Sequence, residues 1–361
     1  MGIGDPRLPT YSLQSQNYFL ACYAVSLIQG DSILGVTLHS KTVWNYLNSA
    51  AELFKQKNNK LNPLYHSNVN HVKVVVRALQ NYEKVPNRRN MISDTMIHWM
   101  HTYTSKLPED SIERAIFDWL LLGRYAGLRL SEWCQTSQTK FARIEEWPGQ
   151  PPYAFVAGDF TFYGQHMHRF DSTETLTLDL IESVGVIFRK QKNSDNGQVI
   201  TFNRDHANPA YCPVQAAFHI FTRAARLQPN KDEPIAVCKN RTNTKVIFIT
   251  DCLTTQFIRK AAIAAHNVSP NSADLSRWST HSIRVTAANL LHRAGLSDSF
   301  IQTRLRWKST AFLMYLRNTF FSADTHTKAL HISDANLPPP ETRSYRERAP
   351  HETSFLQAPA A

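Results

Sequence analysis

The first part of the chain alternates apolar segments of helical period with polar breaks. Apolar side chains recur three or four positions apart in NYFLACYAVSLI (17–28) and VWNYLNSAAELF (43–54), a spacing that places them on one face of a helix. Polar stretches such as KQKNNKLNPLYHSN (55–68) separate these segments. The pattern predicts a small helical domain over residues 1–86.

The second part opens with two more helical segments. SDTMIHWMHTY (93–103) begins at a Ser or Asp cap, and PEDSIERAIFDWLLLGRYAG (108–127) has acids in its first turn and ends on glycine, as helix capping favours. The stretch NYEKVPNRRN before them is polar, basic and contains a proline, which is typical of a linker. We therefore expect a linker at 87–94 and a second domain at 95–330.

Strands follow these helices. YAFVAGDFTFYG (153–164) is aromatic and β-branched, and VGVIFRKQKNSDNGQVITF (184–202) predicts two strands around the turn NSDNG. Helical patterns resume at CPVQAAFHIFTRAARL (212–227) and continue to about residue 320, while the Pro-rich remainder (331–361) predicts a disordered tail. The predicted fold class is mainly α with a small antiparallel β-sheet (α+β).

Composition narrows the class of protein. The 361 residues fit two domains, no run of about eighteen apolar residues predicts a membrane span, and the N-terminus does not predict a secretory signal. Five scattered cysteines without a C-x-x-C pair predict free thiols in a reducing compartment. His98 and His101 share a helix without a third ligand, so no metal site is expected.

The charge points to a polyanionic partner. Forty Lys and Arg against 29 Asp and Glu give a net charge of +11, and nucleic acid is the commonest partner of such proteins. Residues 277–317 carry seven Lys or Arg and one acid. There THSIRVTAANLL places His281 and Arg284 three apart, so both can reach one small anion from one helix face. A second H-x-x-R pair, in QHMHRF, shows that the pattern alone does not define a site.

The segments around this pair resemble the tyrosine recombinase, or phage-integrase, family. Arg284, Trp307 and Tyr315 have the spacing of that family's closing segment. YAGLRLSEW is similar to its first arginine box, a Gly-x-Arg-x-x-Glu pattern that contains Arg129 and Glu132. The similarity extends over residues 95–320 and is only general in the N-terminal helical part.

Two details refine the resemblance. The predicted hairpin is similar to the family's β-hairpin, whose lysine beside the turn corresponds to Lys192, although Lys190 lies on the same strand face two residues away. LRWKSTAFLMYLR has Trp in place of the more usual His and eight residues from Trp to Tyr. In these two features the closing segment most resembles the recombinases of eukaryotic DIRS-like and Crypton-like mobile elements.

The resemblance implies a site that cleaves and rejoins DNA. The implied residues are catalytic Arg129, Lys192, His281, Arg284, Trp307 and Tyr315, supporting Glu132, and the DNA contacts Arg277, Arg304, Arg306 and Lys308. In this chemistry the tyrosine becomes linked to the 3′-phosphate, and arginine, histidine and indole donors stabilise charge on the phosphate oxygens. The lysine protonates the leaving 5′-oxygen, the glutamate orients Arg129 or His281, and neither metal nor cofactor is required.

The family further implies a helical core-binding domain followed by an integrase-like catalytic domain. The expected partner is double-stranded DNA, bound by a homotetramer on two synapsed sites. The expected location is the nucleus for a eukaryotic source and the nucleoid otherwise. Two alternatives stay open: a catalytically inactive DNA-binding protein derived from a mobile element, and a type IB topoisomerase-like enzyme that relaxes supercoils as a monomer.

Overall fold

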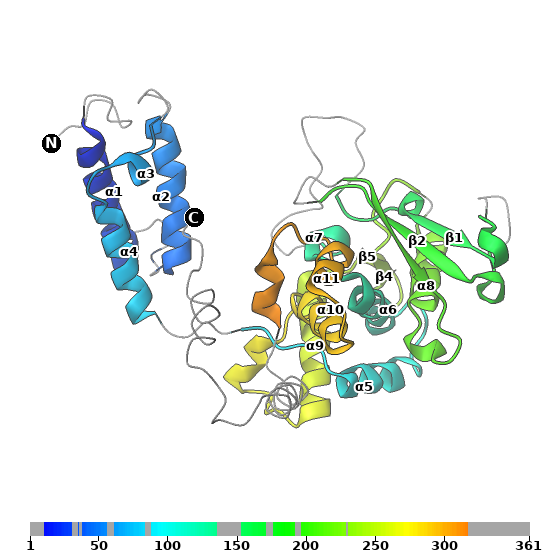
Figure 1. Cartoon of the computed structure of the whole chain (residues 1–361). Helices are drawn as coiled ribbons and strands as arrows, with labels where there is room; N and C mark the ends of the chain where they lie inside the picture. The colour runs from blue at the N-terminus through cyan, green and yellow to red at the C-terminus, as the bar shows by residue number, and fades with distance from the viewer. Residues whose placement is uncertain are drawn as a thin grey trace, which may run out of the picture. The chain divides into compact units, whose positions relative to one another are not determined.

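The computed structural model is shown in Figure 1. It describes residues 11–30, 35, 38–55, 61–83, 88–135, 153–170, 176–191, 196–228 and 230–316. The chain divides into two compact units, residues 1–87 and residues 88–361.

The first unit is helical. It contains α1 (Leu13–Gln29), α2 (Ser40–Lys55), the short α3 (Pro63–His66) and α4 (His71–Tyr82). Its core joins apolar side chains of α1, α2 and α4, among them Leu20, Leu27, Leu47 and Val72. Ser12 caps the start of α1 with its hydroxyl, which accepts the Ser15 N–H, and Gly30 caps its end. Gly30 has φ of 91°, a left-handed conformation that glycine adopts without strain, so the helix ends there.

The second unit is built around one buried helix. Its α-helices are α5 (Asp94–Thr104), α6 (Ile112–Ala126), α7 (Leu130–Trp133), α8 (Pro213–Leu227), α9 (Asp251–His266), α10 (Ser282–Arg293) and α11 (Asp298–Arg304). Helices α5, α8, α9 and α10 all pack against α6. Helix α6 is apolar on almost all sides because other elements surround it.

Two small antiparallel sheets complete the second unit. The first has the order β1 (Phe160–Tyr163), β2 (Ser183–Phe188) and β3 (Gln198–Asn203), with Val186 of β2 paired to Phe160 and to Ile200. Helix α8 packs against this sheet, and its Phe221 ring lies 5.3 Å from that of Phe162, centroid to centroid. The second sheet pairs β4 (Val237–Lys239) with β5 (Val246–Phe248).

The predicted fold class, mainly helical with small antiparallel sheets, is confirmed. The expectation of helices alone between residue 212 and about 320 is wrong at β4 and β5. Each of these strands has three residues, which is too short to show an alternating pattern in the sequence.

Part of the predicted linker is held by the second unit. The Asn90 N–H donates to the Arg277 carbonyl at 2.8 Å, and the Ile92 N–H donates to Thr286 Oγ1 at 2.7 Å. The Met91 carbonyl accepts the indole N–H of Trp278 at 3.2 Å. Residues 90–92 therefore have a fixed path along the second unit.

Two further findings concern the chain as a whole. All five cysteines have free thiols: Cys22 and Cys252 are exposed, and Cys134, Cys212 and Cys238 are buried. No helix in the described part of the chain is long and apolar enough to cross a membrane.

Candidate functional site

Five predicted residues from separate segments meet at one place in the second unit. Arg129 directly precedes α7, while His281 and Arg284 lie at the start of α10. Trp307 follows α11, and Tyr315 is the last residue of a 3₁₀-helix. Up to 186 positions separate these residues in the sequence. The side chains of the last four are in contact, and Arg129 bonds to the carbonyl of Arg306, which directly precedes Trp307.

Aromatic side chains surround the Tyr315 ring. Its centroid lies 5.1 Å from that of His281 and 5.1 Å from that of Trp307. The Tyr315 carbonyl accepts the side-chain amide N–H of Asn289, at 2.8 Å. Phe312, three residues earlier, is completely buried in a cluster with residues of α10 and α11. These contacts fix the position of the tyrosine.

The segment that carries Tyr315 lies within the stretch where the sequence predicts helices. It forms a 3₁₀-helix over Thr310–Tyr315. Three residues per turn place Phe312 and Tyr315 on one side of this helix. As a result, the buried Phe312 anchors the same side that presents Tyr315 to His281 and Trp307.

Arg284 packs against the Trp307 ring of this aromatic group. Its guanidinium carbon is 4.3 Å from the centre of the Trp307 ring, and Nη1 donates to the Gly127 carbonyl at 2.7 Å. The residue is only 5% exposed. Burial, followed by repulsion from Arg129, lowers the pKa of Arg284 to about 9, so it remains protonated at neutral pH.

Arg129 is held by Glu132, the glutamate three residues later in the same motif. Helix α6 ends at Gly127, which is left-handed with φ of 56°, and the chain restarts as α7 after Arg129. The Arg129 backbone N–H donates to Glu132 Oε2 at 2.7 Å, and its Nη1 donates to Oε1 at 3.0 Å. Glu132 is buried, so this carboxylate fixes both the backbone and the guanidinium of Arg129.

Arg306, one of the expected DNA contacts, is buried. It is 4% exposed, and its Nη2 donates to Glu132 Oε2 at 3.0 Å. Its Nη1 donates to the Ala126 carbonyl at 2.8 Å. Burial lowers the pKa of Arg306 to about 10, which still leaves it charged at neutral pH. Arg306 therefore belongs to the interior of the site.

The site carries excess positive charge among its described residues. Three guanidinium groups, from Arg129, Arg284 and Arg306, surround one buried carboxylate, Glu132. Taking charges out of water is costly unless opposite charge compensates them. The arrangement therefore favours an anion that Arg129 and Arg284 can share.

Two uncharged groups complete the site. Burial, with repulsion from Arg284 and Arg89, lowers the pKa of His281, so the imidazole is neutral at pH 7. The Trp307 indole nitrogen is buried and has no hydrogen-bond acceptor in the part of the chain that the structure describes. Buried donors are rarely left without an acceptor, which suggests that this N–H is directed at a ligand.

The other predicted DNA contacts divide into two groups. Arg277 and Lys308 are exposed, with Arg277 ion-paired to Asp274 at 3.7 Å. Arg304 is partly buried, donates to the Thr201 carbonyl and has its guanidinium 4.9 Å from the Phe202 ring centre. Arg304 thus attaches α11 to the sheet. Of the four expected DNA contacts, Arg277 and Lys308 are the two with exposed side chains.

Two lysines, Lys192 and Lys190, are the candidates for the general acid. Lys192 lies outside the described residues. Lys190 is described and partly buried, two residues beyond Phe188, the last residue of β2. As for metals, the described residues include no group of three His, Cys, Asp or Glu that could hold an ion.

Sequence reasoning missed one position that shapes the site and gave another a different role. Asn289, 2% exposed within α10, was missed, and its amide donates to the Tyr315 carbonyl. Arg306 was expected at the DNA surface, and it bonds to Glu132 inside the protein. A polar amide in the apolar run VTAANLL was a usable signal, because buried polar groups need partners. No local signal separates a buried arginine from the exposed Lys308 two residues later.

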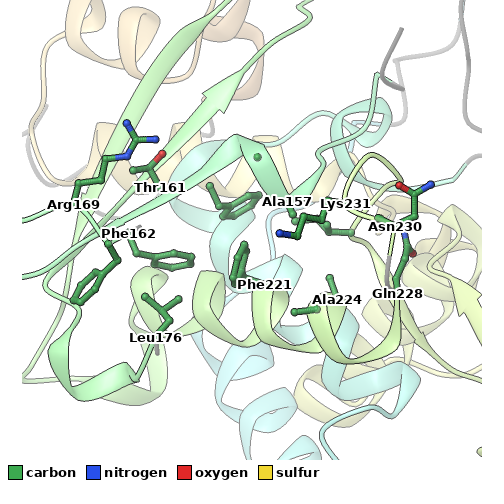
Figure 2. A pocket seen from close by; sticks show the side chains of 15 residues that line it. Ala157, Thr161, Phe162, Arg169, Leu176, Phe221, Ala224, Gln228, Asn230 and Lys231 are labelled. Carbon is green, nitrogen blue, oxygen red and sulfur yellow. The ribbon is translucent and has the colours of Figure 1, made fainter. Parts of the chain in front are cut away.

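A separate pocket lies between β1 and α8. Figure 2 shows Thr161 and Phe162 on the strand side and Phe221 and Ala224 on the helix side. The pocket has a volume of about 430 Å³ and a largely apolar lining. None of the predicted site residues lines it.

No protein-family model matches the sequence, and the comparison with curated proteins found no match. Among solved structures, the chain is similar to a Tn1549 transposon integrase in complex with transposon right end DNA. The identity is 13%, the match covers 87% of this chain and 85% of that chain, and the TM-score is 0.48. It is also similar to the XerH site-specific recombinase bound to a palindromic difH substrate, at 14% identity, 87% and 70% coverage and a TM-score of 0.46.

Proposed function

We propose that the chain is a tyrosine-type DNA recombinase, a site-specific enzyme that cleaves and rejoins DNA strands through a covalent 3′-phosphotyrosyl intermediate. One observation carries this proposal: the Tyr315 ring lies 5.1 Å, centroid to centroid, from both an imidazole and an indole, and the guanidinium of Arg284 contacts that indole. Such a group of residues offers a hydroxyl nucleophile and several hydrogen-bond donors to one anion.

A DNA phosphodiester suits this group of residues. Its two non-bridging oxygens can accept paired N–H donors, which planar guanidinium groups provide in a fixed geometry. Arg129 and Arg284 would hold these oxygens, and the Trp307 indole would donate a further hydrogen bond. In the transition state the phosphate gains negative charge, so preorganised donors stabilise it more than they stabilise the substrate.

Cleavage then needs two proton transfers. The neutral His281 would accept the Tyr315 proton, and the tyrosine oxygen would form a bond to phosphorus while the bond to the 5′-oxygen breaks. A lysine, Lys192 or Lys190, would protonate the leaving oxygen. A 5′-hydroxyl that later attacks the phosphotyrosine restores a phosphodiester and frees Tyr315, so one ester replaces another without ATP.

The proposal extends to the partner and the assembly. We expect the helical domain at 1–86 and the catalytic domain at 95–330 to bind double-stranded DNA, with homotetramers joining two sites. The net charge of +11 and the exposed Arg277 and Lys308 support DNA binding, which should weaken as the salt concentration rises. The action would be nuclear in a eukaryote and at the nucleoid in a bacterium.

The test is formation of a covalent adduct. The full chain first selects bound duplexes from a random-sequence pool, and a nicked suicide version of these duplexes is then incubated with it in excess EDTA. A denaturation-resistant protein–DNA adduct should form, and peptide mapping should place the nucleotide on Tyr315. Tyr315→Phe should abolish the adduct and keep duplex binding, while the half-buried Tyr163, changed to Phe, serves as a matched control with normal adduct formation.

The outcomes distinguish the alternatives. Selected duplexes that are bound but never cleaved would indicate the inactive DNA-binding protein. Relaxed circles produced by a monomer would indicate the topoisomerase-like enzyme, whereas recombinant junctions produced by a tetramer support the recombinase. An adduct on another tyrosine would remove Tyr315 from its role.

A further inference from the structure

Arg306 has a backbone conformation that is unusual for a large side chain. Its φ is 59°, in the left-handed region that glycine adopts freely and that other residues adopt at a cost. The residue is nevertheless 4% exposed and lies directly before Trp307. Strained, buried residues persist only where their surroundings hold them, and they occur often at functional sites.

The Arg306 side chain connects three elements. Nη1 donates to the Ala126 carbonyl at the end of α6 (2.8 Å), and Nη2 donates to Glu132 of α7 (3.0 Å). The guanidinium carbon also lies 3.5 Å from the centre of the Phe188 ring, at the end of β2. The planar group thus makes these two hydrogen bonds and the ring contact in one orientation.

The Arg306 backbone adds a direct contact to Arg129. Its carbonyl accepts the Arg129 Nη2 at 3.1 Å, while its side chain holds the same glutamate that binds Arg129 Nη1. The following residue, Trp307, lies over Arg284. One residue therefore determines where Arg129 and Trp307 stand relative to each other, although 178 positions separate them.

We propose that Arg306 is a positioning residue, which aligns Arg129 and Trp307 on one phosphate and does not itself contact DNA. This inference rests on the proposed function, because the phosphate is that of the cleaved strand. Lysine cannot replace arginine here. Its single ammonium keeps the charge, but it lacks the planar fork that reaches a carbonyl and a carboxylate while lying on a ring.

The first experiment measures the environment of the Trp307 indole and needs no DNA cleavage. The full chain is labelled with ¹⁵N-tryptophan, and its indole N–H resonances are recorded for the wild type and for Arg306→Lys. The chain has seven tryptophans, and the Trp307 resonance is assigned from its loss in Trp307→Phe. Arg306→Lys should shift the Trp307 resonance while those of Trp44 and Trp99 remain in place, because the change is local.

A matched control separates positioning from general damage. Arg223 is also buried, at 3% exposed, and also holds a buried carboxylate, that of Asp118, while its Nε donates to the Glu109 carbonyl at 2.8 Å. Arg223→Lys should lower the melting temperature comparably and leave the Trp307 resonance unchanged. A shift of Trp307 in Arg223→Lys equal to that in Arg306→Lys would overturn the proposal.

The second experiment measures cleavage of the suicide duplex in single turnover. Arg306→Lys should cleave about 100-fold more slowly with little change in the duplex dissociation constant, since a displacement of a catalytic group by about 1 Å has an effect of this size. In an Arg129→Lys background, Arg306→Lys should lower the cleavage rate much less, because the guanidinium that Arg306 positions is already absent. Equal losses in both backgrounds, or a normal rate in Arg306→Lys, would contradict the inference.

The two experiments also separate this inference from the proposed function. A wild-type chain that forms no adduct disproves the proposed function, and the Trp307 resonance then decides the positioning role alone. An unmoved Trp307 resonance in a chain that does cleave DNA disproves the positioning role and leaves the proposed function standing.

Discussion

The Arg284 guanidinium carbon lies 4.3 Å from the centre of the Trp307 ring. This contact joins the start of α10 to the segment after α11. The indole N–H itself has no acceptor among the described residues. The same ring is 5.1 Å from that of Tyr315. Trp307 thus links the buried arginine to the proposed nucleophile, and the following predictions test each participant.

Trp307 should act through its N–H. Trp307→Phe keeps an aromatic ring over Arg284 but removes the donor, and loss of one such donor slows catalysis by roughly 100- to 1,000-fold. Trp307→His restores a ring N–H and should recover part of the rate. The rates are measured by single-turnover cleavage of the suicide duplex. Trp278→Phe, which also loses a buried indole hydrogen bond, is the control and should cleave normally.

Arg129 and Arg284 should matter for cleavage more than for binding. Alanine at either position removes two charge-assisted donors to the phosphate, so cleavage should slow by several orders of magnitude, at least about 100-fold per lost donor. Duplex affinity, which is spread over many phosphates, should fall only modestly. Arg226→Ala removes an exposed arginine that is paired with Asp110 and should change neither quantity much. Cleavage at the normal rate by either active-site mutant would end the role given to that residue.

The general acid can be identified by replacing the leaving oxygen. A substrate with sulfur at the 5′-bridging position has a better leaving group and no longer needs protonation. Lys192→Ala should therefore cleave the ordinary duplex slowly and the sulfur-containing duplex at nearly the wild-type rate. Rescue of Lys190→Ala instead would assign the acid to the position that the structure describes at the end of β2.

His281 should give cleavage a dependence on pH. Burial lowers its pKa below the ordinary value of about 6.5, so the neutral, proton-accepting form persists into mildly acidic solution. The cleavage rate should fall only once the pH drops through this lowered pKa. In His281→Gln the rate should be low at all pH values and lose this dependence, whereas His292→Gln, at the other end of α10, should retain it.

The same lowered pKa affects stability. Below about pH 6.5 the unfolded chain binds a proton at this histidine more readily than the folded chain does. The folded state should therefore lose stability as the pH falls from about 6.5 through the lowered pKa, and His281→Gln should lessen that loss. Urea unfolding at several pH values measures it, and an unchanged pH dependence in the mutant would show that His281 is not the group concerned.

Most of the fold's elements could be predicted from the sequence. Helices α1, α2, α5 and α6 and the β2–β3 hairpin follow from apolar periodicity and from turn or capping residues such as Gly30 and Gly127. These signals work because the hydrogen bonds of a helix or tight turn join residues only a few positions apart. The pair β4–β5 gave no comparable signal because each strand has three residues.

The sequence by itself also selected the five residues that meet at the site, through its resemblance to the tyrosine recombinase family. Only the tertiary structure decided which arginines face inward. Arg306 bonds to Glu132 and Ala126, more than 170 positions earlier, while Lys308 remains exposed two residues away. The low pKa of His281 has the same origin, since it arises from burial and from neighbouring arginines. Burial and charge depend on contacts between distant segments, and no local pattern of residues records them.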